Sequence, residues 1–285
     1  MAKDTFLNRK TTLNVKGRLF DLRTPQVMAI LNITPDSFYS ASRTASIDEA
    51  LQKAGDFLNA GATIIDIGAY SSRPGAADVS EQEELDRIIP VVDALVARYP
   101  EAILSIDTFR AAVAEASVEA GAHIINDISG GTIDPAMFET IAKLQVPYIL
   151  MHMKGTPQTM QQEAQYDDVM LEVVDYFAKK VAELRARGVK DIILDPGFGF
   201  AKTRDHSYEL LNHLEDLNIF GLSYLVGFSR KSMIAKYLKV DPADALNGTT
   251  VLHTIALQKG ASILRVHDVT PAVECIKLVE RTQRR

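Results

Sequence analysis

Residues able to do chemistry in this chain lie directly after short apolar runs. The clearest case is the stretch from Ile192 to Gly197, in which three apolar residues lead straight to the carboxylate of Asp195. Such a run is typical of a strand buried on both faces. Pro196 has no N–H to continue a sheet, and Gly197 permits a sharp turn. On its own, this stretch fits a functional acid and an ordinary turn residue equally well.

The same pattern occurs at seven other places, which are residues 27–31, 63–67, 103–106, 123–126, 147–151, 224–226 and 262–266. Each run predicts a strand, and polar or ionisable residues lie at the carboxyl end of each of the eight runs or shortly after it. These residues are Asn32 and Asp36; Asp66, Ser72 and Arg73; Asp107; Asn126 and Asp127; His152 and Lys154; Asp195 and Lys202; Ser229, Arg230 and Lys231; and Arg265, His267 and Asp268. A helix cap or a turn explains any one of them, for example Asp36, Asp127 or Asp268. Eight in succession favour a shared functional site.

These polar residues suit a nitrogen heterocycle that carries a phosphate group. A carboxylate accepts two parallel hydrogen bonds from an amidine-like edge, and an amide adds a further donor and acceptor. Cations that suit a phosphate or pyrophosphate are Arg73, Arg230, Lys231, Arg265 and His267. The oxygens of Asn32 and Asp36 are of the kind that Mg²⁺ prefers when it keeps most of its waters. No Ser or Cys nucleophile stands beside a His at a readable spacing, and no His-x-x-x-His zinc pattern occurs.

The elements that must position these residues are strands alternating with longer segments of helical spacing. Eight such units in one chain predict an α/β fold, a (β/α)₈ barrel, in which all strands end on one face and their polar residues converge. An open doubly wound sheet is the alternative, but no Gly-x-Gly-x-x-Gly follows the first run. No linker divides residues 1–285, so we expect a single barrel domain, preceded by a short β-hairpin at about residues 12–23.

Composition excludes several classes of function. The formal net charge is -6 and no run of Lys or Arg occurs, so binding to nucleic acid or to a membrane surface is not expected. No apolar stretch approaches the length of about 20 residues that a membrane span needs. Cys275 is the single cysteine, which rules out an internal disulfide. With a polar start that does not resemble a signal peptide, these features favour a cytoplasmic protein.

Eight segments resemble the signatures of the dihydropteroate synthase family. Residues 31–38, with the sequence LNITPDSF, are similar to its first signature, and residues 66–75, DIGAYSSRPG, to its second. The match continues in the family's order through residues 105–108, 125–127, 151–157, 195–197, 227–232 and 265–269. The resemblance spans the chain from about residue 27 to its end, and it implies a pterin-binding (β/α)₈ barrel.

The implied reaction is the condensation of 6-hydroxymethyl-7,8-dihydropterin pyrophosphate with 4-aminobenzoate, which gives 7,8-dihydropteroate and pyrophosphate. The resemblance implies an SN1-like course and a catalytic set made of Asp107, Asp195, Lys231 and Arg265. The implied substrate-binding set is Asp36, Phe38, Ser72, Arg73, Pro74, Asp107, Asn126, Asp195, Phe200, Lys231, Ser232, Arg265 and His267. It also implies Mg²⁺ bound at Asn32, which would assist the departure of pyrophosphate.

Within that set, the resemblance divides the residues by ligand. The pterin ring would be held by Asp107, Asn126, Asp195 and Lys231. Arg265 and His267 would bind the pyrophosphate, with Ser72 nearby. The aminobenzoate would lie among Asp36, Phe38, Arg73, Pro74, Phe200 and Ser232. Sulfonamides are expected as competitive inhibitors, and a homodimer is expected, to which the apolar faces of 251–257 and 273–279 could contribute if they do not pack on the barrel.

The sequence departs from the family in its first two loops. The second loop often carries Gly, Glu and Thr where this chain has Ala69, Tyr70 and Ser72, and Ser40 replaces an Asp of the first. We expect Ser72 to keep the hydroxyl's role, whereas the sequence assigns none to Tyr70. Two other functions stay open: a pterin-binding methyltetrahydrofolate methyltransferase, which has no use for the phosphate cations, and a non-catalytic pterin-binding protein. Lys202 is interpreted as a loop cation.

Overall fold

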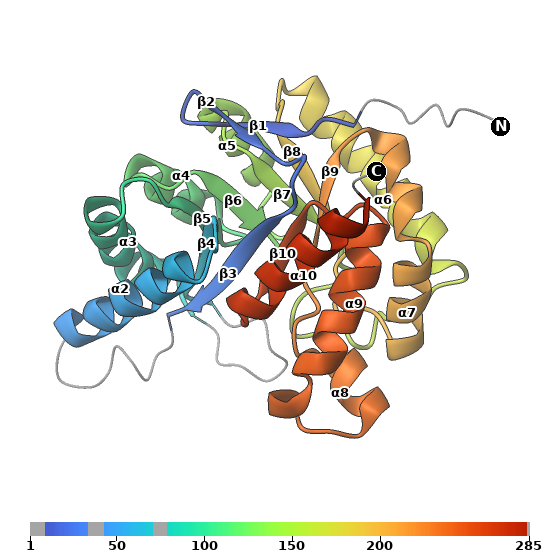
Figure 1. Ribbon diagram of the computed structural model, residues 1–285. Helices are drawn as coiled ribbons and strands as arrows, with labels where there is room; N and C mark the ends of the chain where they lie inside the picture. The colour runs from blue at the N-terminus through green and yellow to red at the C-terminus, as the bar shows by residue number, and fades with distance from the viewer. Residues whose placement is uncertain (1–8, 34–42, 71–78, 284–285) are drawn as a thin grey trace.

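Eight parallel strands form a closed barrel in the computed structural model, which describes residues 9–33, 43–70 and 79–283. Each strand pairs with the next along the chain, and the last pairs with the first (Figure 1). The strands are β3 (Gln26–Asn32), β4 (Ile64–Gly68), β5 (Ile103–Asp107), β6 (Ile124–Asp127), β7 (Tyr148–Met151), β8 (Ile192–Asp195), β9 (Ser223–Val226) and β10 (Ile263–Val266). The predicted (β/α)₈ fold is therefore confirmed, and each predicted run coincides with a strand to within two residues.

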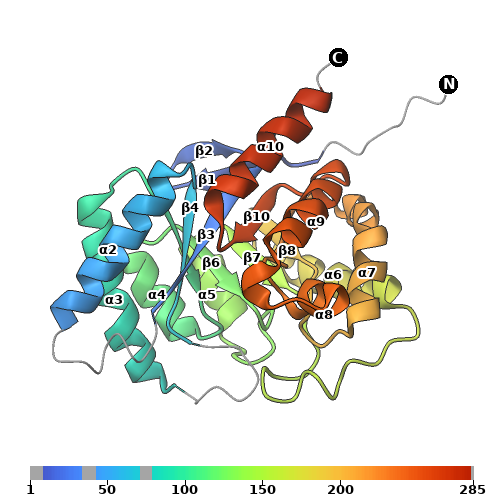
Figure 2. The same ribbon diagram turned by 60° about the horizontal axis from the view of Figure 1, so that its bottom comes forward.

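Helices lie around the outside of the barrel and bury the outer faces of the strands (Figure 2). Because both faces are covered, the strands are apolar runs without alternation, and all residues of β4, β6, β7, β8 and β9 are buried. The helices are α2 (Arg43–Asn59), α3 (Glu81–Arg98), α4 (Ala111–Glu119), α5 (Met137–Leu144), α6 (Val169–Ala186), α7 (Arg204–Asn212), α8 (Ser232–Leu238), α9 (Leu246–Gln258) and α10 (Val269–Gln283). None of the described helices is long and apolar enough to span a membrane.

Helix ends follow local chemistry that the sequence already carries. Ser80 caps α3 by accepting from the Glu83 amide, and Thr203 caps α7 in the same way. Gly61, Gly121, Gly188 and Gly260 have positive φ after their helices, as expected for a left-handed residue that ends a helix. The helix α7 ends at Asn212, and after His213 the chain continues as a 3₁₀ helix, η1 (Leu214–Phe220).

A short antiparallel hairpin, β1 (Thr12–Val15) and β2 (Arg18–Asp21), closes the amino-terminal end of the barrel (Figure 1). Leu13, Val15 and Leu22 pack into one cluster with the residues that begin the barrel strands, among them Ile64 and Ile193. This cluster fills the bottom of the barrel with apolar side chains, so a polar site can lie at the opposite end alone. The predicted hairpin is confirmed.

The carboxyl-terminal end of the barrel carries its own small apolar cluster, separate from the main core. Phe109, Ile128, Met151, Met153, Met160 and Ala201 form it, with Tyr70, Ile133 and Phe200 packed against them. Met151 is the last residue of β7, and the other residues come from the segments that follow five successive strands, β4 to β8. The cluster therefore joins the loops on one side of the barrel mouth, beside the polar residues described next.

Candidate active site

The polar centre of the barrel mouth is Arg265, the third residue of β10. Its Nε donates to Asp66 Oδ2 over 2.6 Å, and its Nη2 donates to Asp107 Oδ2 over 2.7 Å. The two carboxylates come from β4 and β5, which are the second and third strands from β10 around the barrel. One guanidinium thus joins three strands and sets the relative positions of two acids, which a planar fork of donors does better than an ammonium.

Asp66 is wholly buried and accepts two further hydrogen bonds from its neighbours. Ser105 Oγ donates to Oδ1 over 2.6 Å, and Asn126 Nδ2 donates to Oδ2 over 3.1 Å. The strand register explains this, because Asp66 is paired with Ser105, and Asp107 with Asn126. Asp66 therefore orients Arg265 and Asn126, and it has little capacity left for a ligand. The sequence placed Asp66 at a strand end but assigned it no role, because its partners are 39, 60 and 199 residues away.

Asp107 differs from Asp66 because part of its side chain is accessible at the mouth. Its side chain is 20% exposed, against 0% for Asp66. Burial raises the pKa of the Asp107 carboxyl to about 7, while the Arg265 guanidinium opposes this shift by favouring the charged form. Asp107 can therefore accept hydrogen bonds from a ligand and also change its charge near neutral pH.

Asp195 ends β8 and has one side-chain hydrogen bond among the described residues, from the Gly197 amide to Oδ1 over 2.8 Å. The residue is 7% exposed, and burial raises the pKa of its carboxyl. The cations of Lys231, Arg265 and Lys202 lower that pKa in turn. A buried carboxylate with an unused oxygen is a strong acceptor for a ligand's N–H groups. The hydrogen bond to Gly197 gives Asp195 the role of a turn residue, and its other oxygen is left for a ligand.

Lys231 precedes α8 and reaches across to the turn after β8. Its Nζ donates to the Phe198 carbonyl over 2.7 Å and lies 4.6 Å from the centre of the Phe200 ring. Burial lowers the pKa of Lys231 to about 8, against the opposing attraction of Asp195. The ammonium contacts the Phe200 ring and has donors left for a ligand.

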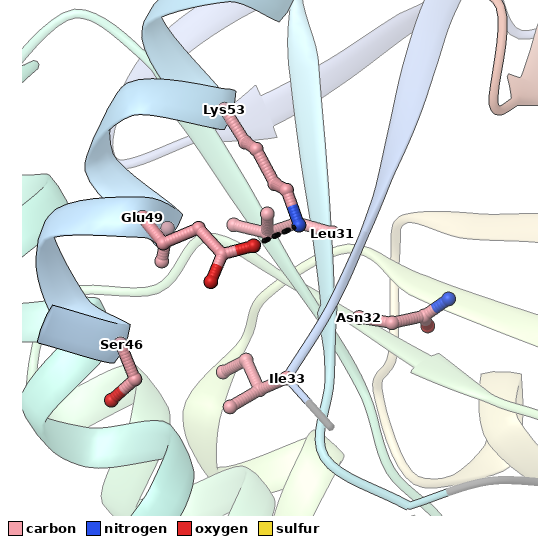
Figure 3. Close-up of a pocket in the computed structure, with 7 residues that line it drawn as sticks. Leu31, Asn32, Ile33, Ser46, Glu49 and Lys53 are labelled. Atoms are coloured by element: carbon pink, nitrogen blue, oxygen red, sulfur yellow. Dashed lines mark ion pairs between the residues drawn. The ribbon is translucent and has the colours of Figure 1, made fainter. Parts of the chain in front are cut away.

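The remaining predicted residues lie at the rim. Phe200 is half-buried, and Ser232 and His267 are exposed. The His267 amide and Nδ1 each lie 3.3 Å from Ser229 Oγ. Asn32 is exposed at the end of β3, and Figure 3 shows its amide pointing away from the Glu49–Lys53 ion pair of the adjacent small pocket.

Five predicted residues lie outside the described part of the chain: Asp36, Phe38, Ser72, Arg73 and Pro74. Tyr70, immediately before one gap, is described. Its ring packs edge-on against Phe109 with centroids 5.0 Å apart, and its hydroxyl accepts from Gln158 Nε2 over 2.8 Å. Tyr70 therefore joins the segment after β4 to the segment after β7, a contact between residues 88 positions apart that spacing could not predict.

Arg230 was a candidate phosphate ligand, and the structure contradicts this. Its guanidinium forms a two-pronged pair with Asp268, over 2.7 and 2.8 Å, and donates to the carbonyls of Pro242 and Ala243. These partners lie after β10 and in the η2 turn (Pro242–Asp244), so Arg230 braces the α8–α9 connection. Asp127 is likewise a turn acid, because it accepts from Tyr148 and from the amides of Ser129 and Gly131.

Lys202 was interpreted as a loop cation, and this too is wrong. The residue is 3% exposed, and its Nζ lies 2.9 Å from His152 Nδ1. It also donates to the carbonyls of Phe200 and His152. Spacing could not predict that Lys202 is buried, because its partner His152 lies 50 residues away along the chain.

The fold and the site together define a class of protein. Buried acids and cations converge at the carboxyl-terminal end of a closed barrel, beside an apolar wall, as they do in (β/α)₈-barrel enzymes that act on small molecules.

Comparison with known proteins identifies the family. The model of the family described as "Pterin binding enzyme" matches residues 28–267. Dihydropteroate synthase of Escherichia coli K12 is 46% identical over 272 residues, covering 95% of this chain and 96% of that protein. A Yersinia pestis dihydropteroate synthase structure with a sulfonamide has a TM-score of 0.89 at 48% identity, covering 95% and 99% of the two chains. A Xanthomonas albilineans dihydropteroate synthase structure with 7,8-dihydropteroate has a TM-score of 0.84 at 33% identity, covering 96% and 98%.

The chain therefore belongs to the pterin-binding enzymes, among the dihydropteroate synthases. It is a transferase of folate biosynthesis. The methyltransferase and non-catalytic alternatives are set aside.

Proposed function

We propose that this chain condenses 6-hydroxymethyl-7,8-dihydropterin pyrophosphate with 4-aminobenzoate at the barrel mouth, through the residues described above. The observation that carries this assignment is the Arg265 centre, where a cation, two acids and an amide from four strands share one hydrogen-bonded group. Such a group combines acceptors for a pterin's amino and ring N–H donors with a donor for phosphate oxygens.

In the proposed binding mode, the pterin lies between Asp107 and Asp195, with Asn126 and Lys231 completing its hydrogen bonds. Asp195 keeps one oxygen unused by other described residues, and Asp107 is partly accessible. Acceptors aimed at fixed positions in a buried site favour a ligand whose donors match them, because an unmatched buried carboxylate loses its hydration without compensation.

Departure of pyrophosphate is the step that the cations favour. Arg265 uses Nε and Nη2 for its two carboxylates, so Nη1 has no partner among the described residues and can donate to the leaving group. His267 lies two residues further on and is exposed at the rim. Charge that grows on the pyrophosphate is stabilised by such donors without reorganisation of the site.

The methylene carbon left behind carries positive charge, conjugated with the pterin ring. Asp107 and Asp195 favour that charge electrostatically because they lie in a site of low polarity. The arylamine of 4-aminobenzoate is neutral near pH 7 and attacks the methylene carbon without a strong base. The proton that the nitrogen then loses passes to the departed pyrophosphate or to water. Phe200 and Lys231 would hold it, the ring by packing and the carboxylate by its charge, so catalysis depends mainly on positioning.

Asn32 fits a magnesium ion that is held chiefly by water and by the substrate's phosphates. Its side chain is exposed at the mouth and has no hydrogen bond to another described residue. A hard cation of this kind needs few protein ligands, and an amide oxygen is one that it accepts. When bound, Mg²⁺ would neutralise charge on the pyrophosphate.

Pyrophosphate release is the direct test of this function. The full chain would be incubated with the pterin pyrophosphate, 4-aminobenzoate and Mg²⁺, with release expected only when all three are present. Treatment with EDTA should abolish release, and added Mg²⁺ should restore it. A folded protein that releases no pyrophosphate would rule out the proposed reaction, and release that is insensitive to EDTA would rule out the magnesium part alone.

The proposal also includes a cytoplasmic homodimer. The faces 251–257 and 273–279 mostly pack inward, since Leu252, Ala256 and Ile276 are buried, but Val251 is 51% and Leu278 is 68% exposed. Other large apolar side chains are exposed on the outer helices, among them Leu171 and Tyr237. Sedimentation equilibrium should give twice the chain mass, and a monomer at micromolar concentration would contradict the dimer.

A further inference from the structure

The turn after β8 is held by a buried lysine that the proposed reaction does not use. Lys202 Nζ lies 3.1 Å from the Phe200 carbonyl, 3.3 Å from the His152 carbonyl and 2.9 Å from His152 Nδ1. An ammonium has three N–H donors, and here it meets three acceptors. Lys202 is therefore saturated by protein groups and has no donor left for a substrate.

The turn that Lys202 holds is unfavourable by itself. Three of its residues have left-handed backbone conformations, Gly197 with φ 70°, Gly199 with φ 79° and Ala201 with φ 48°. For Ala201, which has a Cβ, this conformation is strained by about 1–2 kcal/mol. Such strain persists only where surrounding contacts hold the backbone in place. Lys202, the residue after Ala201, supplies three of these contacts.

The partner of the turn is His152, which follows β7. Its carbonyl approaches Gly197 so closely that a Cβ there would lie 2.1 Å from the oxygen. The imidazole packs edge-on against Tyr176, with centroids 4.8 Å apart, and burial lowers the pKa of His152 to about 2. His152 is thus neutral and fixed, so it offers Nδ1 and a carbonyl as constant acceptors.

Burying a lysine here opposes stability. Desolvation lowers the pKa of Lys202 to about 7 in spite of nearby Asp195, so the folded state disfavours the charged form. An apolar side chain of similar length would avoid this penalty but would hold neither carbonyl. The contacts that Lys202 makes all serve the position of the turn and of the loop beside it.

We propose that Lys202 is a positioning residue for the second substrate: by tying Phe200 to His152, it fixes the Phe200 ring beside the Lys231 ammonium. The ring is then held from two sides, by Lys202 through the backbone and by Lys231 through Nζ, which lies 4.6 Å from the ring centre. This inference depends on the proposed function, in which Phe200 and Lys231 hold 4-aminobenzoate.

The test separates positioning from general stability. Lys202→Met removes all three hydrogen bonds and should raise KM for 4-aminobenzoate roughly 10- to 100-fold, with little change in KM for the pterin pyrophosphate. His152→Phe keeps the ring packing and removes one acceptor, so it should give a smaller rise. Lys154→Met is the matched control, because Lys154 lies two residues after His152 but its Nζ contacts Gln165, Glu172 and the Tyr166 ring. It should leave both KM values unchanged.

Hydrogen exchange adds a readout that does not need activity. Amides of residues 197–202 should exchange faster in folded Lys202→Met than in the unchanged protein, while β7 and β8 keep their protection. Equal KM values for 4-aminobenzoate in all variants, or a parallel loss for both substrates, would overturn the positioning role. If the unchanged protein releases no pyrophosphate, the proposed function fails, whereas altered exchange confined to the turn would still support the Lys202 tether.

Discussion

Replacement of Asp195 by Asn is the sharpest test of the acid at the end of β8. The substitution keeps the shape and the acceptor that the Gly197 amide uses, over 2.8 Å, and removes the charge. At the other oxygen it places an NH₂ group where the proposed pterin also presents donors. Loss of one hydrogen bond to a charged group, with a donor facing a donor, weakens binding by about 2–4 kcal/mol, or roughly 30- to 900-fold in Kd.

The same substitution should not destabilise the free protein. Burial raises the pKa of the Asp195 carboxyl, so the folded state holds its proton more tightly than the unfolded chain does. Ionised Asp195 therefore destabilises the folded state. This destabilisation is absent at low pH and appears as pH rises above the pKa of the group in the unfolded chain. A neutral amide removes that penalty at pH 7, so Tm should be unchanged or higher.

Calorimetric titration with the pterin pyrophosphate and thermal unfolding measure the two effects separately. Asp191→Asn is the matched control, because Asp191 immediately precedes β8 at the opposite end of the barrel, where it pairs with Lys10 over 2.5 Å. It should lower Tm and leave pterin affinity unchanged. Pterin affinity within threefold for Asp195→Asn would show that Asp195 does not bind the pterin, and a large fall in Tm would assign it to the turn.

Three further predictions follow from particular contacts. Gly197→Ala should lower the free energy of unfolding by at least about 2 kcal/mol in urea titration, because the added Cβ would lie 2.1 Å from the His152 carbonyl oxygen. At Gly188 an added Cβ meets nothing within 4 Å, so Gly188→Ala should lower it by about 1 kcal/mol. Equal losses in the two variants would contradict the packing argument. Since burial lowers the pKa of Lys231 to about 8, kcat/KM for the pterin pyrophosphate should fall as pH rises through 8 and the ammonium loses its charge; a flat profile to pH 9.5 would remove that charge from the mechanism. A sulfonamide should raise the apparent KM for 4-aminobenzoate without changing kcat, and a lowered kcat at saturating aminobenzoate would place the drug elsewhere.

The sequence by itself determined the barrel and the face that carries the site. Apolar runs such as Ile192–Asp195 are buried on both sides by helices, so the strand signal needs no long-range information. The helix ends follow from Ser80, Thr203 and the glycines at left-handed positions. Because parallel strands must end on one face, the convergence of Asp107, Asp195 and Arg265 followed from topology.

Only the tertiary structure decided which polar residues bind each other and which remain for a ligand. Arg230 and Lys202 follow strand ends just as Arg265 and Lys231 do, yet Arg230 pairs with Asp268 and Lys202 is saturated by His152 and Phe200. Asp66, which the sequence left without a role, orients Arg265 across the barrel. Spacing along the chain places a residue at the mouth, but distant partners fix its hydrogen bonds: Asp268 is 38 residues from Arg230, and Asp66 is 199 residues from Arg265. Those bonds decide whether a charged side chain is saturated by protein groups or keeps donors and acceptors for a substrate.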